Sequence, residues 1–338
     1  MNSEEIISKI LEKYKEIKYF FYENKKEIYF QGFLIVSLSF IFFLLINIFF
    51  SPAKFPTKTI LTINSGDSLQ EVTEQLYNEK IIRSKLIFRS YIILKGGEKK
   101  IIAGDYLLDK KQGLLSLANR FTEGLFGLND IRITIPEGWN VFQIANYLEK
   151  TLIKFNKDEF LSLAIKDEGY LFPDTYFVSP TIKEKTLVDL MKKNFDDKIS
   201  KIEAINNLDE PLEDIIKMAS ILEGEAKPKD RRIVAGILWQ RLSMGMPLQV
   251  DTSFIYINGK STFDLSLDDL KIDSPYNTYK YKGLPPTPIS NPGVDAILAA
   301  MNPEKTKYLY FLTDEEGNMH YAKTFEEHKR NKELYLNS

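Results

Sequence analysis

MASILEGEA, residues 218–226, lies in a segment that begins near Pro211 and is predicted to form an α-helix. Its apolar residues recur three and four positions apart, as on the buried face of a helix: Ile215, Ala219, Leu222 and Ala226. At 3.6 residues per turn, Glu223 and Glu225 border this face on opposite sides. Partial burial there would raise the pKa of either carboxyl from about 4.3 towards roughly 6. In the alternative interpretation, both are surface glutamates of an amphipathic helix.

The composition excludes several classes of site and partner. The chain has 338 residues, enough for two or three domains, and its 45 basic and 47 acidic residues nearly balance. It therefore has no basic field for a nucleic-acid partner. Because cysteine is absent, disulfides and thiolate metal sites are impossible. The two histidines, His320 and His328, are too few for a three-histidine zinc site, so we expect neither a metal nor a cofactor.

The N-terminal region is predicted to anchor the chain in a membrane. Residues 1–31 mix lysine and glutamate closely, which indicates a solvated helix or a partly disordered tail. The 18 residues 33–50 carry no charge and would span about 27 Å as a helix, which matches a bilayer core of roughly 30 Å. We predict a membrane span over residues 32–50 and a stiff tether over residues 51–58, in preference to a buried soluble helix or a cleaved signal peptide.

The distribution of lysines predicts the orientation of this span. Six lysines precede it, whereas only Lys54 and Lys58 follow it closely. The positive-inside rule then places residues 1–31 in the cytoplasm and residues 51–338 outside. We therefore expect a single-pass protein of the cell membrane, which is the inner membrane where an outer one exists.

Two segments downstream of the tether resemble each other. Residues 61–76 and 133–148 both read as a short strand, a turn at glycine and a helix, and Ser68 and Asn140 occupy the expected N-cap positions. The first segment, with GDSL at residues 66–69, resembles the LysM module, which binds N-acetylglucosamine glycans. We predict a LysM-like module over residues 59–127 and a second α+β module over residues 128–200. Two ordinary α+β units are the alternative.

The C-terminal part, residues 201–338, is predicted to be a mostly helical domain with a small β element, so the whole chain is α+β. The pattern indicates helices over residues 231–242, with Asp230 as a candidate cap, and 294–301, and a hairpin with strands in 308–313 and 319–321. The loop GLPPTPISNPG, residues 283–293, is a candidate groove wall. The stretch EGYLFPDTY, residues 168–176, suits a domain junction or a sugar-stacking wall.

Several of these motifs occur together, in this order, in the MltG (YceG-like) family of endolytic murein transglycosylases, which this chain resembles over residues 33–330. The motifs are LFPDTY at 171–176, ASILEGE at 219–225, LQVD at 248–251, YNTY at 276–279, GLPP at 283–286, NPG at 291–293, and the two closing histidines. The membrane span and the LysM-like segment fit the same arrangement.

This resemblance implies a reaction and its acid. The family cuts murein strands internally between N-acetylmuramic acid and N-acetylglucosamine, leaves 1,6-anhydromuramic acid ends, and limits the elongation of nascent strands. Lytic transglycosylases place the acid before a small residue, and Glu225 precedes Ala226, so the resemblance selects Glu225 over Glu223 as general acid and then base. Ala226 stands where a hydroxyl residue is common, and Gly224 where a longer residue is usual. Peptidoglycan strands, and peptidoglycan synthases beside growing murein, are the implied partners.

Supporting roles at the substrate are expected for a further set of residues: Glu223, Gln249, Asp251, Tyr276, Asn277, Thr278, Tyr279 and Pro285. Asn277 and Thr278 could instead brace their loop. The two histidines are expected to be structural or to orient substrate. Two other functions remain open: a glycan-binding scaffold without activity, and a hydrolytic muramidase in which Asp251 is a second catalytic carboxylate beside Glu225.

Overall fold

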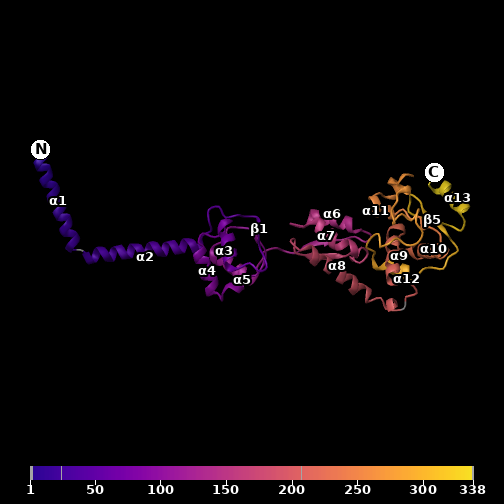
Figure 1. Cartoon of the computed structure of the whole chain (residues 1–338), viewed down its shortest axis with the longest axis horizontal. Coiled ribbons are helices and arrows are strands. Elements are labelled where there is room, and N and C mark those ends of the chain that lie inside the picture. Colours follow the sequence, from indigo (N-terminus) through magenta and orange to yellow (C-terminus); the bar gives the residue numbers. More distant parts are fainter. Residues whose placement is uncertain (1–2, 24, 207, 337–338) are drawn as a thin grey trace. The chain divides into compact units, whose positions relative to one another are not determined.

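The computed structural model describes residues 3–23, 25–206 and 208–336, which form a mixed α+β and mostly helical structure (Figure 1). Contacts between residues divide the chain into two compact units, Met1–Leu128 and Asn129–Ser338. Short 3₁₀ turns occur at Glu98–Lys100, Ile165–Asp167, Glu203–Asn206, Thr262–Asp264 and Asp269–Lys271.

The N-terminal residues form two helices, α1 (Ser3–Glu23) and α2 (Lys25–Phe49). Helix α2 begins eight residues before the apolar run at 33–50 and is long and apolar enough to cross a membrane. Nearly all of its large apolar side chains are exposed, as in a helix that meets lipid and unlike a core helix. A membrane anchor and a signal sequence share these properties.

The rest of the first unit is a small α+β module. Strands β1 (Thr59–Ile63) and β2 (Gly104–Leu108) pair antiparallel, and helices α3 (Leu69–Asn78), α4 (Lys85–Leu94) and α5 (Leu114–Glu123) gather beside them (Figure 1). The core side chains come from all five elements, and Tyr106 and Phe121 are completely buried. Ser68 caps α3 in a reciprocal capping box with Glu71, which confirms the N-cap predicted there.

The second unit begins with a module of the same order. Strands β3 (Ile131–Thr134) and β4 (Thr175–Val178) pair antiparallel, and helices α6 (Val141–Thr151) and α7 (Lys157–Ala164) lie between them in sequence. Asn140 caps α6 in a capping box with Gln143, as predicted. The similarity between residues 61–76 and 133–148 therefore extends to a whole strand–helix–helix–strand unit. Helix α8 (Glu184–Ile199) completes this part.

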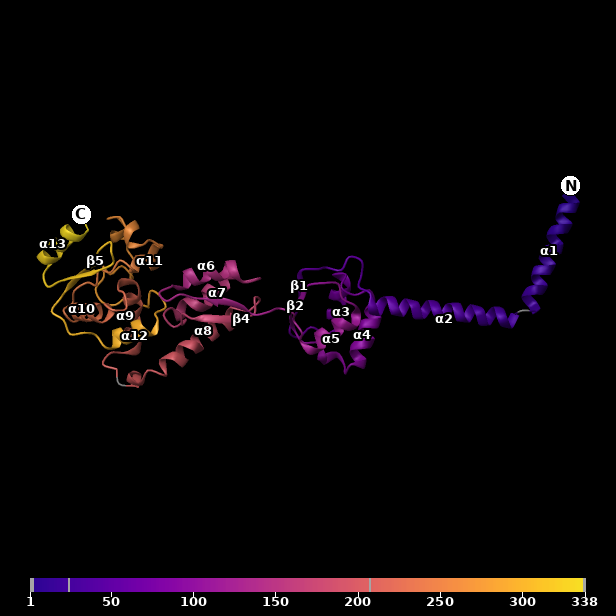
Figure 2. The ribbon, with the colours of Figure 1, turned by 180° about the vertical axis from the view of Figure 1, so that it is seen from behind.

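Three helices form the core of the C-terminal part: α9 (Leu212–Glu225), α10 (Arg231–Ser243) and α12 (Val294–Met301), which lie together in Figure 2. Helix α11 (Ser253–Asn258), the hairpin β5 (Tyr310–Thr313) and β6 (Met319–Ala322), and α13 (Phe325–Tyr335) surround them. The predicted helices and hairpin are confirmed. Asp230 occupies the predicted N-cap position of α10, but its side chain makes no capping bond. Its Oδ1 accepts a hydrogen bond from the hydroxyl of Tyr321 instead.

Asn291 joins the α+β part of the second unit to its helical part. Its Oδ1 accepts hydrogen bonds from the N–H groups of Gly169 and Leu171, each at 2.9 Å. Its Nδ2 donates to Glu168 at 2.8 Å and to the carbonyl oxygen of Trp139 at 3.0 Å. Asn291 has no exposed surface, and these four bonds use the whole hydrogen-bonding capacity of its amide.

Glu168 completes this junction. It is buried, and its Oε2 accepts from the N–H of Val141, the first residue of α6, at 2.9 Å. Burial raises the pKa of Glu168 to about 8, against the opposing effect of its hydrogen bonds. The neighbouring Gly169 packs so closely on Pro288 that a Cβ would clash. Residues 168–171 therefore serve as a junction within the second unit.

Candidate active site

Glu225 is the last residue of α9 and is only partly exposed. After it the backbone becomes extended at Ala226. The Oε1 atom of Glu225 accepts two hydrogen bonds from Thr252, one from the backbone N–H at 3.1 Å and one from the hydroxyl at 2.8 Å. Burial raises the pKa of Glu225 to about 7, although both Thr252 bonds oppose this shift. Near neutral pH, the carboxyl is therefore divided between its acid and base forms.

Gly224 makes room for this arrangement. A Cβ at position 224 would lie 2.5 Å from the methyl carbon Cγ2 of Thr252, far inside contact distance. Because glycine has no side chain, Thr252 can approach the end of α9 and place its hydroxyl on Glu225. The glycine that weakens this helix by roughly 1 kcal/mol thus allows the hydrogen bond to the acid.

Glu223 lies in a different environment, although it is only two residues away. Its side chain is 5% exposed; Oε1 pairs with the guanidinium of Arg231, and Oε2 accepts from the N–H of Gly293 at 2.9 Å. Arg231 also contacts Asp295 at 2.8 Å and the carbonyl oxygen of Ala226 at 3.1 Å. Burial raises the pKa of Glu223, and Gly293 and Arg231 oppose the shift. These contacts are those of an ion pair that fixes the end of α9, and binding of substrate by Glu223 stays a prediction.

A second carboxylate, Asp251, lies next to Thr252 in the chain. Its Oδ1 accepts a hydrogen bond from the hydroxyl of Tyr279 at 2.6 Å. Burial and this bond raise the pKa of Tyr279, so the phenol remains a donor. The charge of Asp251 favours the neutral form of Glu225, whereas the charge of Arg241 opposes it. Asp251 thus supports the acid form of Glu225 through its charge.

The backbone of Gln249 is strained. Its φ of +49° is in the left-handed region that side chains other than glycine avoid, and its N–H donates to the carbonyl oxygen of Thr278 at 3.1 Å. The side chain of Thr278 is buried and bridges to the backbone of Val250, with Oγ1 3.0 Å from that N–H. Gln249 itself is exposed. Strain of this kind can mark functional sites, and the substrate role of Gln249 stays a prediction.

Asn277 and Thr278 lie inside the protein, with exposures of 0% and 3%. The amide of Asn277 donates to the carbonyl oxygens of Leu270 and Ile272, at 3.0 and 2.8 Å. Both residues thus make contacts that brace their loop, which is the predicted alternative to substrate binding. Pro285 is buried too.

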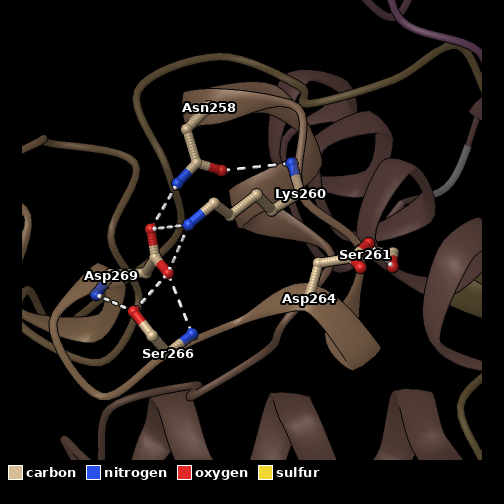
Figure 3. A network of polar contacts seen from close by, with 6 residues as sticks. All are labelled: Asn258, Lys260, Ser261, Asp264, Ser266 and Asp269. Atoms are coloured by element: carbon tan, nitrogen blue, oxygen red, sulfur yellow. Dashed lines mark hydrogen bonds and ion pairs between the residues drawn. The ribbon is translucent and has the colours of Figure 1, made fainter.

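Figure 3 shows a polar network that holds the loop between α11 and Tyr276. Asp269 lies at its centre: it accepts from Lys260 through both oxygens at 2.8 Å, from Asn258 at 3.0 Å, and from the Ser266 hydroxyl at 2.6 Å. The Lys260 ammonium, followed by the Ser266 bonds, holds the pKa of Asp269 well below its usual range. A loop fixed in this way can present Tyr276 in one orientation.

Three aromatic rings lie in contact between α6 and the C-terminal part. Phe142 on α6 is 5.7 Å from Tyr256 on α11, and Tyr256 is 4.8 Å from Tyr276, measured between ring centroids. The hydroxyl of Tyr276 bonds to Thr287 at 2.9 Å. All three residues are partly exposed. Such rings can stack on sugars.

Known proteins resemble this chain over most of its length. The YceG-like family matches residues 61–334. The chain belongs to the YceG-like family. It is 33% identical over 318 residues to the endolytic murein transglycosylase of Bacillus subtilis (strain 168), and the match covers 85% of this chain and 88% of that one. It is 32% identical to the endolytic murein transglycosylase of Streptococcus pneumoniae serotype 2 (strain D39), with 82% of this chain and 58% of that longer protein covered.

A solved structure supports the same family. The 2.6 Å crystal structure of a YceG-like protein from Listeria monocytogenes is 30% identical and superposes with a TM-score of 0.54. The match covers 80% of this chain and 98% of the Listeria chain.

The two histidines of this YceG-like chain lie away from the contacts of Glu225. His320 on β6 bonds to Asp314 at 2.8 Å and stacks on Tyr335 with ring centroids 3.6 Å apart. His328 on α13 packs on Tyr310 at 5.4 Å. Within residues 3–23, 25–206 and 208–336, no group of three or more acidic or histidine side chains could hold a metal ion.

Sequence reasoning missed several residues that define this site. Thr252 follows the LQVD motif directly and is the hydrogen-bond partner of Glu225, so its hydroxyl next to that motif was an available signal. Arg231 and Gly293 hold Glu223, but nothing local in the sequence joins them to it. No role was predicted for Phe142 or Tyr256.

Proposed function

We propose that this chain is a membrane-anchored lytic transglycosylase that cuts peptidoglycan strands internally between N-acetylmuramic acid and N-acetylglucosamine. Glu225 acts as general acid and then as general base, and the products carry 1,6-anhydromuramic acid ends. The relatives named endolytic murein transglycosylase, at 32–33% identity over more than four fifths of the chain, support the reaction class. The observation that carries the role of Glu225 is its environment: partly exposed, not ion-paired, and with a pKa near 7.

The proposed mechanism needs only one carboxyl group. Protonated Glu225 donates its proton to the glycosidic oxygen as the bond to the anomeric carbon breaks. The resulting carboxylate accepts the proton of the sugar's own 6-hydroxyl while that oxygen closes on the anomeric carbon, so Glu225 ends the cycle protonated and no water is consumed. An intramolecular hydroxyl has a high effective concentration, and no second carboxylate has to activate a nucleophile.

Thr252 has a defined part in this cycle. Its hydroxyl and N–H both donate to Oε1 of Glu225, so they stabilise the carboxylate that forms when the proton leaves. Burial favours the acid before donation. Burial outweighs both bonds, and the resulting pKa of about 7 lies where one group can both give and take a proton.

We assign binding of the strand to solvent-accessible groups of the second unit. The rings of Phe142, Tyr256 and Tyr276 offer faces on which sugars can stack, and Gln249 presents an amide held in a strained backbone. Glycan binding by the LysM-like residues 59–127 adds affinity without chemistry in this proposal. Insertion of residues 32–50 as a single span with a cytoplasmic N-terminus, and cooperation with peptidoglycan synthases, belong to the same proposal.

The decisive experiment digests purified sacculi with the full chain in detergent and weighs the products. Glu225→Gln should slow cutting by a factor of about 10² to 10⁴, because a positioned general acid accelerates a reaction by that factor. The change is nearly isosteric, so the variant should still fold. Products of the unchanged protein should be lighter than hydrolysed ends by the mass of one water molecule.

Asp251→Asn is the matched control. It should leave the anhydro product in place, whereas a hydrolytic muramidase would lose its second carboxylate and stop. Hydrolysed ends from the unchanged chain, or undiminished cutting by Glu225→Gln, would refute the proposal. Absence of any product would leave the scaffold function as the correct one.

A further inference from the structure

Helix α1 (Ser3–Glu23) has one continuous apolar face. Taking 100° per residue, the large apolar side chains between Ile6 and Ile17 cover about 140° of arc: Ile6, Ile7, Ile10, Leu11, Tyr14 and Ile17. Each of these is more than two fifths exposed, and Ile10 and Tyr14 reach 63%. A helix that exposes so much contiguous apolar surface needs a cover outside its own unit.

The charges of α1 are arranged in zones around this face. At 100° per residue, Lys13 borders it on one side and Lys15 on the other. Lys18 lies just inside the second border, and Glu12 and Glu16 lie near the middle of the opposite face. Lysines at both borders can lay their methylene chains on an apolar layer and lift their ammonium groups to phosphates above it. The glutamates then face water, away from the phosphates. A helix buried between two protein surfaces would not require this order.

The position of α1 in the chain favours the same cover. It ends one residue before α2, the helix long and apolar enough to cross a membrane, so α1 cannot leave the vicinity of that bilayer. We propose that α1 lies in the headgroup layer of the membrane that α2 spans, with the face of Ile6, Ile10 and Ile17 in the acyl boundary. This inference rests on the proposed anchoring by α2. For the residues of α1, it replaces the solvated helix or partly disordered tail predicted for residues 1–31.

The binding is apolar in character. Helix α1 carries four lysines and five glutamates, so it has no net positive charge to attract anionic lipid. We therefore expect its depth in the bilayer to be the same in purely zwitterionic vesicles and in vesicles that contain anionic lipid, and to be insensitive to salt.

Because the chain has no cysteine, a single introduced thiol can report on one position of the full chain. We would attach a nitroxide at Ile10→Cys, on the apolar face, at Glu12→Cys on the polar face, and at Phe42→Cys within α2. The full chain is reconstituted in phosphatidylcholine vesicles, and accessibility to oxygen and to a water-soluble nickel chelate is measured by electron paramagnetic resonance. Positions 10 and 42 should favour oxygen severalfold over nickel, and position 12 the reverse.

The three positions separate the outcomes. If the label at position 42 favours oxygen while the label at position 10 favours nickel, this inference is overturned and the anchoring by α2 still holds. Nickel access at position 42 would overturn the anchoring and the inference with it. Spin–spin broadening at position 10 that unlabelled protein removes would mean that a second copy covers the face, and would overturn the inference too. Ile17→Cys repeats the test about two turns further along the same face. Helix α1 lies outside all three cores, so neither label threatens folding.

Discussion

Replacing Thr252 by valine should move the pH dependence of cutting upward. Valine keeps the shape of threonine but removes the hydroxyl that donates to Oε1 of Glu225 at 2.8 Å, while the backbone N–H bond remains. A hydrogen bond to a charged group is worth about 1.5–3 kcal/mol, and one pKa unit is about 1.36 kcal/mol. The pKa of Glu225 should therefore rise by about 1–2 units, from about 7 to about 8–9.

The sign of the effect follows from the role of the acid. In the proposed mechanism only protonated Glu225 donates to the glycosidic oxygen, so kcat/KM should be full below the pKa of the free enzyme and fall as pH rises through it. In Thr252→Val this fall should begin about 1–2 units higher. The low-pH plateau should drop by up to about 10²-fold, because the carboxylate formed during proton transfer has lost a donor.

The measurement is kcat/KM for release of anhydro ends from defined glycan strands, followed from about pH 5 to pH 10. Thr252→Ser keeps the hydroxyl and is the matched control, with a midpoint close to that of the unchanged chain. A Thr252→Val midpoint at or below that of the unchanged chain would refute the reasoning, because the hydroxyl would then not stabilise the charged form of Glu225.

Three further predictions concern the frame around the acid. Asn291→Ala should lower the free energy of unfolding in urea by about 3–5 kcal/mol, because it leaves buried hydrogen-bond partners on both sides of the junction unpaired. The control Asn302→Ala, at an exposed site, should lower it by less than about 1 kcal/mol. Equal losses in the two variants would contradict this prediction. Gln249→Gly should raise the free energy of unfolding by about 1 kcal/mol, because glycine relieves the left-handed backbone, yet it should slow the cutting of glycan strands. Lys80→Gly, also at a positive φ, should raise the free energy of unfolding and leave the rate of cutting unchanged. Asp269→Ala should make its loop a preferred site of limited proteolysis, and an unaltered digest would show that the network does not hold it.

The parts of the fold that the sequence predicts are those whose causes are local. Ser68 and Asn140 announce helices because a short polar side chain binds the N–H three residues ahead, and the structure has both capping boxes. Helix α12 follows Gly293 over the predicted residues, and the β5–β6 hairpin turns at the predicted glycine, Gly317. Each signal lies within a few positions of the feature it specifies.

The difference between Glu223 and Glu225 has a distant cause. The helical periodicity places both at the borders of the apolar face and predicts the raised pKa, which the structure has for each. Their partners come from elsewhere: Arg231 and Gly293 for the first, and Thr252 for the second. Contacts with distant segments decide that Glu223 is ion-paired and Glu225 is not. The sequence of one helix does not show these contacts. The substrate roles assigned around them stay predictions.

The absent side chain at position 224 ties the composition of a helix to the strength of an acid. Alanine there would displace Thr252 and break the hydrogen bond from its hydroxyl to Glu225. The gain in helix propensity would therefore be accompanied by a change in the pKa of Glu225. Positions 224 and 252 should accordingly be replaced in pairs as this lineage diverges, and a library randomised at 224 alone, selected for cutting, should return glycine.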